Sequence, residues 1–580
     1  MSARCSALLC VALVACSHPV VDEPAAVERP SIVLIVLDAL RADHLSVYGY
    51  PRATSPHLER LREDGVLFRR AYAAAPTTLP SVAQMLTSSY FPDTYRHSSW
   101  IDVALAAGYE TSAAIVNNPW AGKWVAHLEP TFGTVTTGAF SATAITDKAL
   151  AWLDANRARS VVTYLHYLDT HTPYQAPEKF VRSFIDDAYA GSIGLRFHYP
   201  KGVWTGEYDT ADRQRIVDLY DAAVAYTDFE LGRLFDGMRE HDLYEDSLIV
   251  VTADHGEEFW EHGSVFHGQS LYEELLHVPL VVKFPRGWGA GREVSEAVST
   301  VDILPTLAEL MLRQQGSTDA IDDGWAGTSL IGTVRGDDAP RGELFATVAR
   351  TEARSPPRHA LLEQGRYKYI RNVDDSSEEL YDLVHDPAET DDLSASQNAA
   401  VIDRMRARLA AYTARLWERG YKIEVRNAGT RTVRYELQVA AQPPAPLASV
   451  DSRCERGSAT LGVYGNGTGL LVSGTLAPGD EGRFRFDLLR GDGALHLVAR
   501  LDGAPWPAGD VLIGRRALPA ATYPSGVPVD SDALDGVPEI ATAPRAPTVR
   551  LWRIGGVEHA APATLTAAER ERLQALGYLR

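Results

Sequence analysis

One apolar run followed by an acid and a histidine constrains the possible fold and function of this chain more than any other sequence feature. Residues Leu248 to Thr252 are apolar or β-branched, as in a buried parallel strand, and Asp254, His255 and Gly256 follow almost at once. Ligands of open α/β sheets bind where strands end at their carboxyl edge. A carboxylate and an imidazole at such an edge suit Zn²⁺, Mn²⁺ or a similar divalent ion, although a structural turn explains these residues equally well when they are taken alone.

Two further segments place polar groups at positions where a ligand could bind. Residues 31–37 are a continuous apolar run that predicts a central strand, and Asp38 follows it directly. A buried acid is costly unless it is paired or binds a metal, although Asp38 could also cap the next turn. Thr78 lies just before a predicted helix with Pro80 in its first turn. Its hydroxyl would lie among unpaired N–H groups suited to phosphate or sulfate, and a capping threonine is the alternative explanation.

Strands and helices alternate through the first part of the chain. Further strands are predicted within 108–116, 161–168 and 280–284, and an amphipathic helix at 213–238. This alternation predicts a mainly parallel central sheet with helices on both faces. His171 follows the strand at 161–168, and His267 follows the Asp254 segment, so several segments deliver Asp, Thr or His to one end of the sheet. Arg41 and Asp43 are expected to form a structural ion pair.

The N-terminus predicts export. Arg4 and the short apolar run after it are typical of a signal peptide, and residues 13–16 (Leu-Val-Ala-Cys) resemble a bacterial lipobox, in which Cys16 receives a lipid. An ordinary cleaved signal is the alternative, and the run is shorter than the ~20 residues of a membrane-spanning helix. Ser17 after the cysteine resembles the sorting signal for the outer membrane. We therefore expect a lipid-anchored protein of the cell envelope, facing the periplasm or the surface, and the net charge of −20 argues against a nucleic-acid partner.

Several short motifs occur together along the chain. They occupy residues 38–43, 78–81, 171–174, 253–256, 271–279, 301–306, 365–370, 379–383 and 386–389. In this order they resemble the sulfatase-like branch of the alkaline phosphatase superfamily, and they span about residues 31–395. The resemblance implies the α/β fold of that superfamily and an enzyme that cleaves phosphoric or sulfuric esters.

The resemblance also implies a role for each candidate residue. The metal ligands would be Asp38, Thr78, Asp254 and His255, and the catalytic residues would be Thr78, His171 and His267. A divalent ion lowers the pKa of a coordinated hydroxyl, which would make Thr78 a nucleophile near neutral pH. The two other histidines would face the transferred group and the leaving oxygen, where an imidazole can protonate the departing alkoxide. The covalent Thr78 ester would then pass to water or to an acceptor alcohol.

Three departures from the sulfatase pattern affect the expected chemistry. Sulfatases oxidise a Cys or Ser to formylglycine, which Thr78 cannot become, and Val82 replaces the arginine of the same motif. Ala39 replaces the second acid of the usual pair, which weakens a calcium-type ligand set. We therefore expect one or two divalent ions, Zn or Mn rather than Ca or Mg, and phosphate esters ahead of sulfate esters. The alternatives are a true sulfatase with an unmodified threonine and a non-catalytic, lipid-anchored binding pseudoenzyme.

The chain divides into six expected segments. They are a signal peptide with lipobox (1–16), a tether (17–30), a sulfatase-like catalytic domain (31–315), the C-terminal part of that fold (316–420), a β-sandwich accessory domain (421–550) and a tail with a docking helix (551–580). The sandwich is predicted from short alternating segments separated by Gly, Pro and Asp turns. The expected partner is a phosphate- or sulfate-ester substrate such as an envelope glycan or lipid, with membrane contact through the lipid on Cys16.

Overall fold

The computed structural model describes most of the chain, with gaps. Its described residues are 27, 29–90, 99–109, 112–116, 133–137, 141–198, 208–312, 325–337, 341–348, 358–373, 377–395, 398–417, 420–442, 447–454, 458–464, 469–488, 494–507, 511–513, 516–517, 527–529 and 546–554. The predicted signal peptide with Cys16, residues 17–26 of the tether and the predicted tail helix lie outside them. Within them, no helix has the length and apolarity that crossing a membrane requires.

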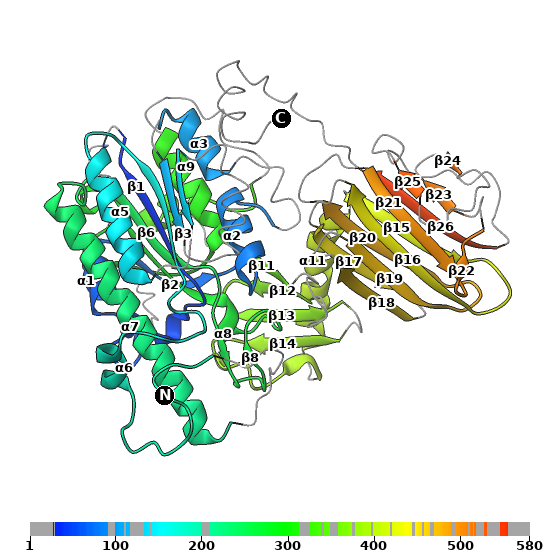
Figure 1. Ribbon diagram of the computed structural model, residues 1–580, viewed down its shortest axis with the longest axis horizontal. Coiled ribbons are helices and arrows are strands. Elements are labelled where there is room, and N and C mark those ends of the chain that lie inside the picture. Colours follow the sequence, from blue (N-terminus) through cyan, green and yellow to red (C-terminus); the bar gives the residue numbers. More distant parts are fainter. Residues whose placement is uncertain are drawn as a thin grey trace, which may run out of the picture.

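An eight-stranded sheet forms the centre of the first domain (Figure 1). In spatial order its strands are β10 (Arg292–Ser299), β2 (Val66–Tyr72), β9 (His277–Lys283), β6 (Leu248–Ala253), β1 (Ile32–Leu37), β5 (Val162–Tyr167), β3 (Ser112–Val116) and β4 (Thr134–Thr137). Every residue of β1 is buried, because the strand lies between β5 and β6. Among the neighbouring pairs that the structure describes, five are parallel and the two that include β9 are antiparallel. The expected mainly parallel sheet is confirmed.

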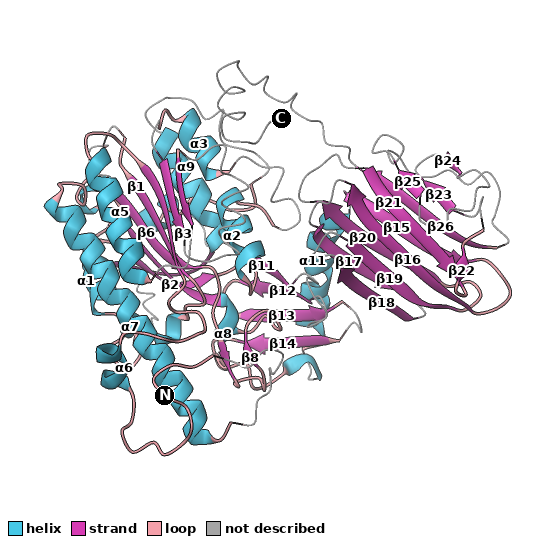
Figure 2. Ribbon diagram, viewed as in Figure 1, coloured by secondary structure: helices cyan, strands magenta, loops and turns pink. Residues whose placement is uncertain are grey.

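Helices cover both faces of this sheet, as the sequence predicts (Figure 2). One layer holds α1 (Pro56–Asp64), α5 (Ala142–Asn156), α6 (Glu178–Phe184) and α7 (Thr210–Glu240), and the other holds α2 (Thr78–Thr87), α3 (Trp100–Ala106) and α9 (Ile303–Leu312), with α10 (Ile331–Arg335) against β10. The helix predicted at 213–238 is α7. It buries Ile216, Leu219 and Leu231 in the main core, so its apolar side faces the sheet as its periodicity requires.

A smaller antiparallel sheet and a helix follow. The strands are β11 (Glu343–Val348), β12 (Arg358–Glu363), β13 (Tyr367–Asn372) and β14 (Glu378–Asp382), and α11 (Ala399–Trp417) packs on them. Phe345, Leu361 and Tyr369 share one core with Ile402 and Met405 of α11. This unit lies beside the main sheet, next to the hairpin of β7 (Glu258–Phe259) and β8 (Val265–Phe266) and the short helix α8 (Glu273–Leu276) (Figure 1).

The last described part of the chain is a β-sandwich. Its strands are β15 (Gly420–Asn427), β16 (Val433–Gln442), β17 (Leu447–Cys454), β18 (Ser458–Tyr464), β19 (Gly469–Leu476), β20 (Glu481–Leu488), β21 (Ala494–Leu501), β22 (Ala504–Pro505), β23 (Val511–Ile513), β24 (Arg516–Ala517), β25 (Val527–Val529) and β26 (Pro547–Ile554). They form two six-stranded sheets. Alternate residues such as Ile423, Val425, Leu437 and Phe484 fill the core between the sheets, which is the period-two pattern of a sandwich.

A hydrogen-bonded pair of His262 and Glu274 connects the β7–β8 hairpin to α8. Nδ1 of His262 lies 2.7 Å from Oε1 of Glu274, and Nε2 lies 3.1 Å from the carbonyl oxygen of Glu389. The imidazole also stacks on Tyr272, with ring centroids 3.6 Å apart. Burial alone would lower the pKa of His262, but the hydrogen bond and charge of Glu274 outweigh it and raise the pKa to about 9.

This pair is expected to make stability depend on pH. Because the pKa of His262 is higher in the folded protein than its usual 6.5, the stabilisation is fully present below pH 6.5 and is lost as pH rises through about 9. Below pH 6.5 we expect the unfolding free energy of wild type to exceed that of His262→Gln by roughly 2 kcal/mol. This difference should disappear as the pH rises above about 9. Denaturant titrations across this range measure it. His385→Gln, at an exposed histidine, is the control, and a gap for His262→Gln that stays constant with pH would contradict the assignment.

Candidate metal and nucleophile site

The candidate site lies where the central strands end. β1, β5 and β6 run parallel, and Leu37 pairs with Tyr167 on one side and Ala253 on the other. Asp38 and Asp254, the next residues of β1 and β6, therefore emerge side by side at the carboxyl edge of the sheet. The two strand ends that the sequence singles out thus meet at one place.

Asp38 is fully buried among histidines. Its Oδ2 lies 2.9 Å from Nε2 of His166, and its Oδ1 lies 3.8 Å from Nε2 of His255. The hydroxyl of Thr170 donates to its backbone carbonyl at 2.5 Å. Burial alone would raise the pKa of Asp38, but the hydrogen bond to His166 outweighs it, together with the positive charges that His171, His166 and His255 carry at the acid pH where Asp38 titrates, and the pKa is lowered to about 2. The carboxyl group is therefore a carboxylate at neutral pH.

Asp254 is the second buried carboxyl group. Its Oδ1 accepts hydrogen bonds from the backbone N–H groups of Ala39 at 3.2 Å and His255 at 3.0 Å. Its Oδ2 is buried and has no hydrogen-bond partner among the described residues, and it lies 3.6 Å from Nε2 of His255. Burial and the neighbouring charge of Asp38 raise the pKa of Asp254. A cation between the two carboxyl groups would offset both their burial and the repulsion between their negative charges.

His255 has one nitrogen directed into the site. Its Nδ1 lies 2.8 Å from the carbonyl oxygen of Gly256. That nitrogen therefore carries the proton and donates a hydrogen bond to the carbonyl. Nε2 is then an unprotonated acceptor that points toward Asp38, Asp254 and Thr78. A histidine held in this tautomer by a backbone carbonyl is the usual form of a metal ligand.

Thr78 lies next to His255 in the same group of side chains. It is the first residue of α2, after the N-cap residue Thr77, and its Oγ1 lies 3.3 Å from Nε2 of His255. The capping role that the sequence left open for Thr78 is not observed, since its hydroxyl faces the histidine. One turn later, the hydroxyl of Ser81 donates to the carbonyl of Asp254 at 2.5 Å, which fixes α2 to the end of β6.

His171 and His267 complete the group. The ring centroid of His267 lies 4.3 Å from that of His255 and 5.0 Å from that of His171. Nδ1 of His171 lies 2.5 Å from the carbonyl oxygen of Thr172, and Nδ1 of His267 lies 3.5 Å from Oε2 of the buried Glu257. The structure therefore brings together all six residues that the sequence singles out.

Gly256 and the Arg41–Asp43 pair lie beside the site, and the ion pair is the one that the sequence predicts. A Cβ atom at Gly256 would lie 2.0 Å from the backbone carbonyl oxygen of Glu274, so the close backbone approach there requires glycine. Arg41 pairs with Asp43 at 2.8 Å and also with Glu261, which makes it a structural ion pair beside the site.

The sequence did not reveal two residues of the site. His166 lies two residues before the end of the predicted strand at 161–168, and it contacts Asp38. Glu257 is fully buried, and burial together with the charge of Asp38 raises its pKa far above the usual range. The only signal for His166 was an imidazole in an otherwise buried strand, which is more often a core residue than a ligand.

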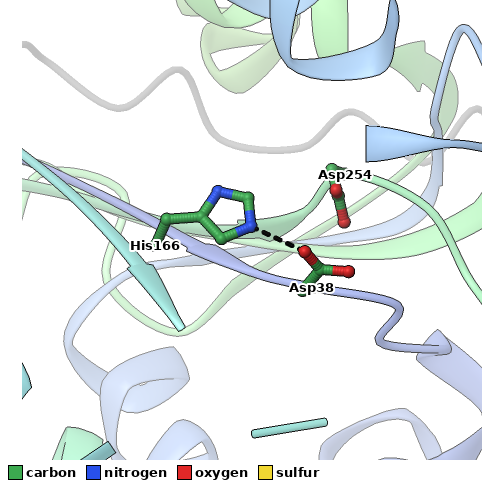
Figure 3. Close-up of side chains that lie close together, drawn as sticks. All are labelled: Asp38, His166 and Asp254. Atoms are coloured by element: carbon green, nitrogen blue, oxygen red, sulfur yellow. Dashed lines mark hydrogen bonds and ion pairs between the residues drawn. The ribbon is translucent and has the colours of Figure 1, made fainter. Parts of the chain in front are cut away.

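The donor atoms of the site fit a divalent metal ion. Asp38, His166 and Asp254 each offer an oxygen or nitrogen atom, and these atoms all lie within 4.8 Å of one another (Figure 3). His255 adds an unprotonated nitrogen on the other side of Asp38. Mixed carboxylate and imidazole donors suit Zn²⁺ or Mn²⁺ better than Ca²⁺, which prefers oxygen.

Comparison with known proteins places this fold and site in a family. The family profile described as Sulfatase matches residues 30–312, and the profile described as N-sulphoglucosamine sulphohydrolase, C-terminal, matches residues 260–415. Residues 30–312 belong to the sulfatase family. All six candidate site residues of this sulfatase-family domain lie within the matched range, whereas the β-sandwich lies outside both.

Relatives of this chain include enzymes. Arylsulfatase K of Gallus gallus is 25% identical over 453 residues, which cover 66% of this chain and 82% of that protein. The ulvan-active sulfatase of Formosa agariphila is 26% identical over 428 residues, which cover 64% of this chain and 78% of that protein. These relatives are ester hydrolases, so the expectation that the chain is an enzyme of this class is confirmed.

Solved structures share the fold. A protein in complex with its substrate D-glucosamine-2-N,6-O-disulfate superposes with a TM-score of 0.55 at 17% identity, over 67% of this chain and 98% of that chain. The phosphonate monoester hydrolase of Agrobacterium radiobacter superposes with a TM-score of 0.54 at 21% identity, over 67% of this chain and 96% of that chain. At these identities the likeness concerns the fold alone.

Proposed function

We propose that this chain is a metal-dependent hydrolase or transferase that cleaves phosphate or sulfate esters through a covalent intermediate on Thr78. One observation carries the proposal: Oγ1 of Thr78 lies 3.3 Å from Nε2 of His255, whose Nε2 also faces the buried carboxyl groups of Asp38 and Asp254. A hydroxyl beside a set of metal-binding donors is the arrangement that activates an alcohol as a nucleophile.

Each residue has a role in the proposed reaction. Asp38, Asp254 and His255 would hold the divalent ion, which, when bound, lowers the pKa of the Thr78 hydroxyl and stabilises charge on the transferred group. Oγ1 of Thr78 releases its proton to solvent and forms a bond to phosphorus or sulfur while the bond to the leaving oxygen breaks. An imidazole, that of His267 or His171, gives its proton to that oxygen. The oxygen of water or of an alcohol then attacks phosphorus or sulfur and gives its proton to the imidazole, while the bond to Oγ1 of Thr78 breaks and Oγ1 takes up a proton from solvent.

The choice between phosphate and sulfate esters rests on the nucleophile. Thr78 cannot become the formylglycine that sulfatases use, and Val82 stands in place of the arginine of that motif. A plain alcohol forms a phosphate ester that a second nucleophile can cleave at phosphorus, so we place phosphate esters first. Sulfate esters are the second candidate, because the named relatives are sulfatases. The gathering of the six candidate residues in one cluster of contacting side chains disfavours the non-catalytic alternative.

A substrate panel tests the proposed function. Hydrolysis of an aryl phosphodiester, phosphomonoester, phosphonate monoester and sulfate ester would be measured after chelation and after addition of Zn²⁺, Mn²⁺ or Ca²⁺. Metal-dependent phosphodiester turnover supports the leading proposal, and sulfate turnover alone favours the second candidate. A protein that binds none of the ions and cleaves none of the esters would be a binding protein.

Replacement of the histidine that protonates the leaving oxygen should slow the cleavage of esters with poor leaving groups most. For His267→Gln we expect kcat/KM to fall by about 10²-fold on an alkyl ester and only a few-fold on a 4-nitrophenyl ester, because nitrophenolate departs without a proton. The same pair of substrates with His171→Gln shows which imidazole is the acid. His277→Gln, at a histidine that contacts Arg69 and Tyr72, is the control. Equal losses on both esters in both site variants would contradict an acid role.

We also propose that the chain acts in the cell envelope, anchored by a lipid on Cys16, on an envelope glycan or lipid that carries phosphate or sulfate. The proposal rests on residues 13–17 of the sequence. Mass spectrometry of the N-terminal peptide tests it: a diacylglyceryl group on Cys16 is expected, and an unmodified N-terminus after a different cleavage site would contradict it.

A further inference from the structure

His166 lies between two polar groups in the interior of the protein. Tyr164 and His166 are two residues apart on β5, so their side chains point to the same face of the sheet. The hydroxyl oxygen of Tyr164 lies 2.8 Å from Nδ1 of His166, and Nε2 of His166 lies 2.9 Å from Oδ2 of Asp38. All three side chains are fully buried. They form a chain of hydrogen bonds that ends on a carboxylate of the candidate metal site.

The direction of these hydrogen bonds follows from the hydroxyl group. Burial and the charges of Asp254 and Asp38 raise the pKa of Tyr164 well above its usual value, so the hydroxyl keeps its proton. Among the described residues, Nδ1 of His166 is the single hydrogen-bond partner of that hydroxyl. A buried O–H group donates where an acceptor is in reach, so Tyr164 donates to Nδ1. In the neutral imidazole the proton is then on Nε2, which donates a hydrogen bond to Oδ2 of Asp38.

His255 has the opposite tautomer. Its Nδ1 donates to the carbonyl of Gly256, which leaves Nε2 as an acceptor directed at Oδ1 of Asp38. The two histidines thus contact the two oxygens of one carboxylate in different ways. A protonated nitrogen cannot bind a metal ion, whereas an unprotonated one can.

We infer that Tyr164 and His166 are a positioning pair that lies outside the coordination sphere of the metal. This pair holds Oδ2 of Asp38, so that Oδ1 alone faces the ion. The inference rests on the proposed metal-dependent function. It separates the three residues of Figure 3 into two ligands, Asp38 and Asp254, and one residue that orients a ligand. It also assigns the site a single imidazole ligand, His255. Partners that orient a ligand typically change metal affinity 10–100-fold.

X-ray absorption of the zinc-loaded protein tests the assignment without any variant. Multiple scattering from imidazole rings gives the number of histidine ligands. We expect one imidazole per zinc ion. Two imidazoles would contradict a ligand set with His255 as its single imidazole and would overturn the inference, while leaving the proposed metal-dependent function intact.

Removal of one hydroxyl tests the role of Tyr164. For Tyr164→Phe we expect the Kd for Zn²⁺, measured by calorimetry, to rise by about 10-fold, because His166 loses the donor that fixes its tautomer. Tyr167→Phe is the matched control: this tyrosine is on the same strand, is equally buried and hydrogen-bonds to Thr146, and its Kd should stay within about twofold of wild type. An unchanged Kd for Tyr164→Phe would overturn the inference. Wild-type protein that binds no zinc, manganese or calcium would refute the proposed function, and the inference with it.

Discussion

Replacement of Thr78 by alanine is expected to lower kcat/KM for the best ester substrate by at least about 10³-fold, because the covalent intermediate cannot form. The hydroxyl is at the N-terminus of α2 and lies 3.3 Å from Nε2 of His255. Thr78→Ser keeps the hydroxyl and should retain measurable turnover. The Kd for the metal ion should change far less than kcat/KM, since Asp38, Asp254 and His255 remain.

Thr77 provides a matched control for this variant. It is the N-cap residue of α2, yet its side chain makes no capping hydrogen bond, so Thr77→Ala should leave the helix and turnover nearly unchanged. Mass spectrometry of acid-quenched reactions would detect the intermediate as a phosphate or sulfate group on Thr78. Turnover of Thr78→Ala within tenfold of wild type would show that water attacks the substrate directly and that the threonine is not the nucleophile.

Replacement of Asp254 by asparagine is expected to have opposite effects on metal binding and on the stability of the metal-free protein. The Kd for Zn²⁺ or Mn²⁺ should rise by about 100-fold or more, because a charged ligand is lost. The metal-free protein should gain roughly 1 kcal/mol in unfolding free energy, since burial and the charge of Asp38 raise the pKa of Asp254 and disfavour its charged form. The asparagine oxygen can still accept the hydrogen bonds from Ala39 and His255.

Two titrations measure this pair of effects. Calorimetry gives the Kd of the metal ion, and denaturant unfolding with and without a chelator gives the stability of each form. Asp246→Asn is the control, because Asp246 lies near the start of β6, is exposed and pairs with Arg286 at the surface. A variant of Asp254 that binds metal as well as wild type does would remove this residue from the ligand set. A loss of stability in the metal-free variant would show that the carboxylates do not repel one another.

Local patterns were sufficient for the elements that carry the site. The uninterrupted apolar runs before Asp38 and Asp254 predict β1 and β6, because only strands buried on both faces tolerate such runs in a sheet covered by helices. Since parallel strands bring their carboxyl ends to one edge, the acids after these strands had to be neighbours. Thr78, His171 and His267 follow from predicted element boundaries, the family resemblance supplied their roles, and the structure places them beside these acids.

Other features depend on contacts between distant segments. The apolar run at 280–284 reads as a strand, but its direction follows from pairing with β2 and β6, and β9 is antiparallel to both. Thr78 could equally have capped α2, and its rotation toward His255 appears only when α2 is fixed to the end of β6 through Ser81.

The sequence by itself determined the strands, the helices and the residue types gathered at the edge of the sheet, because hydrophobic periodicity and the ends of apolar runs are local properties of the chain. Only the tertiary structure decided which nitrogen of each histidine faces the site. His166 and His255 carry the same side chain, yet Nδ1 of His166 accepts a hydrogen bond from Tyr164, whereas Nδ1 of His255 donates one to the carbonyl of Gly256. The tautomer of a histidine is set by the partner that its other nitrogen meets, and that partner is fixed by packing.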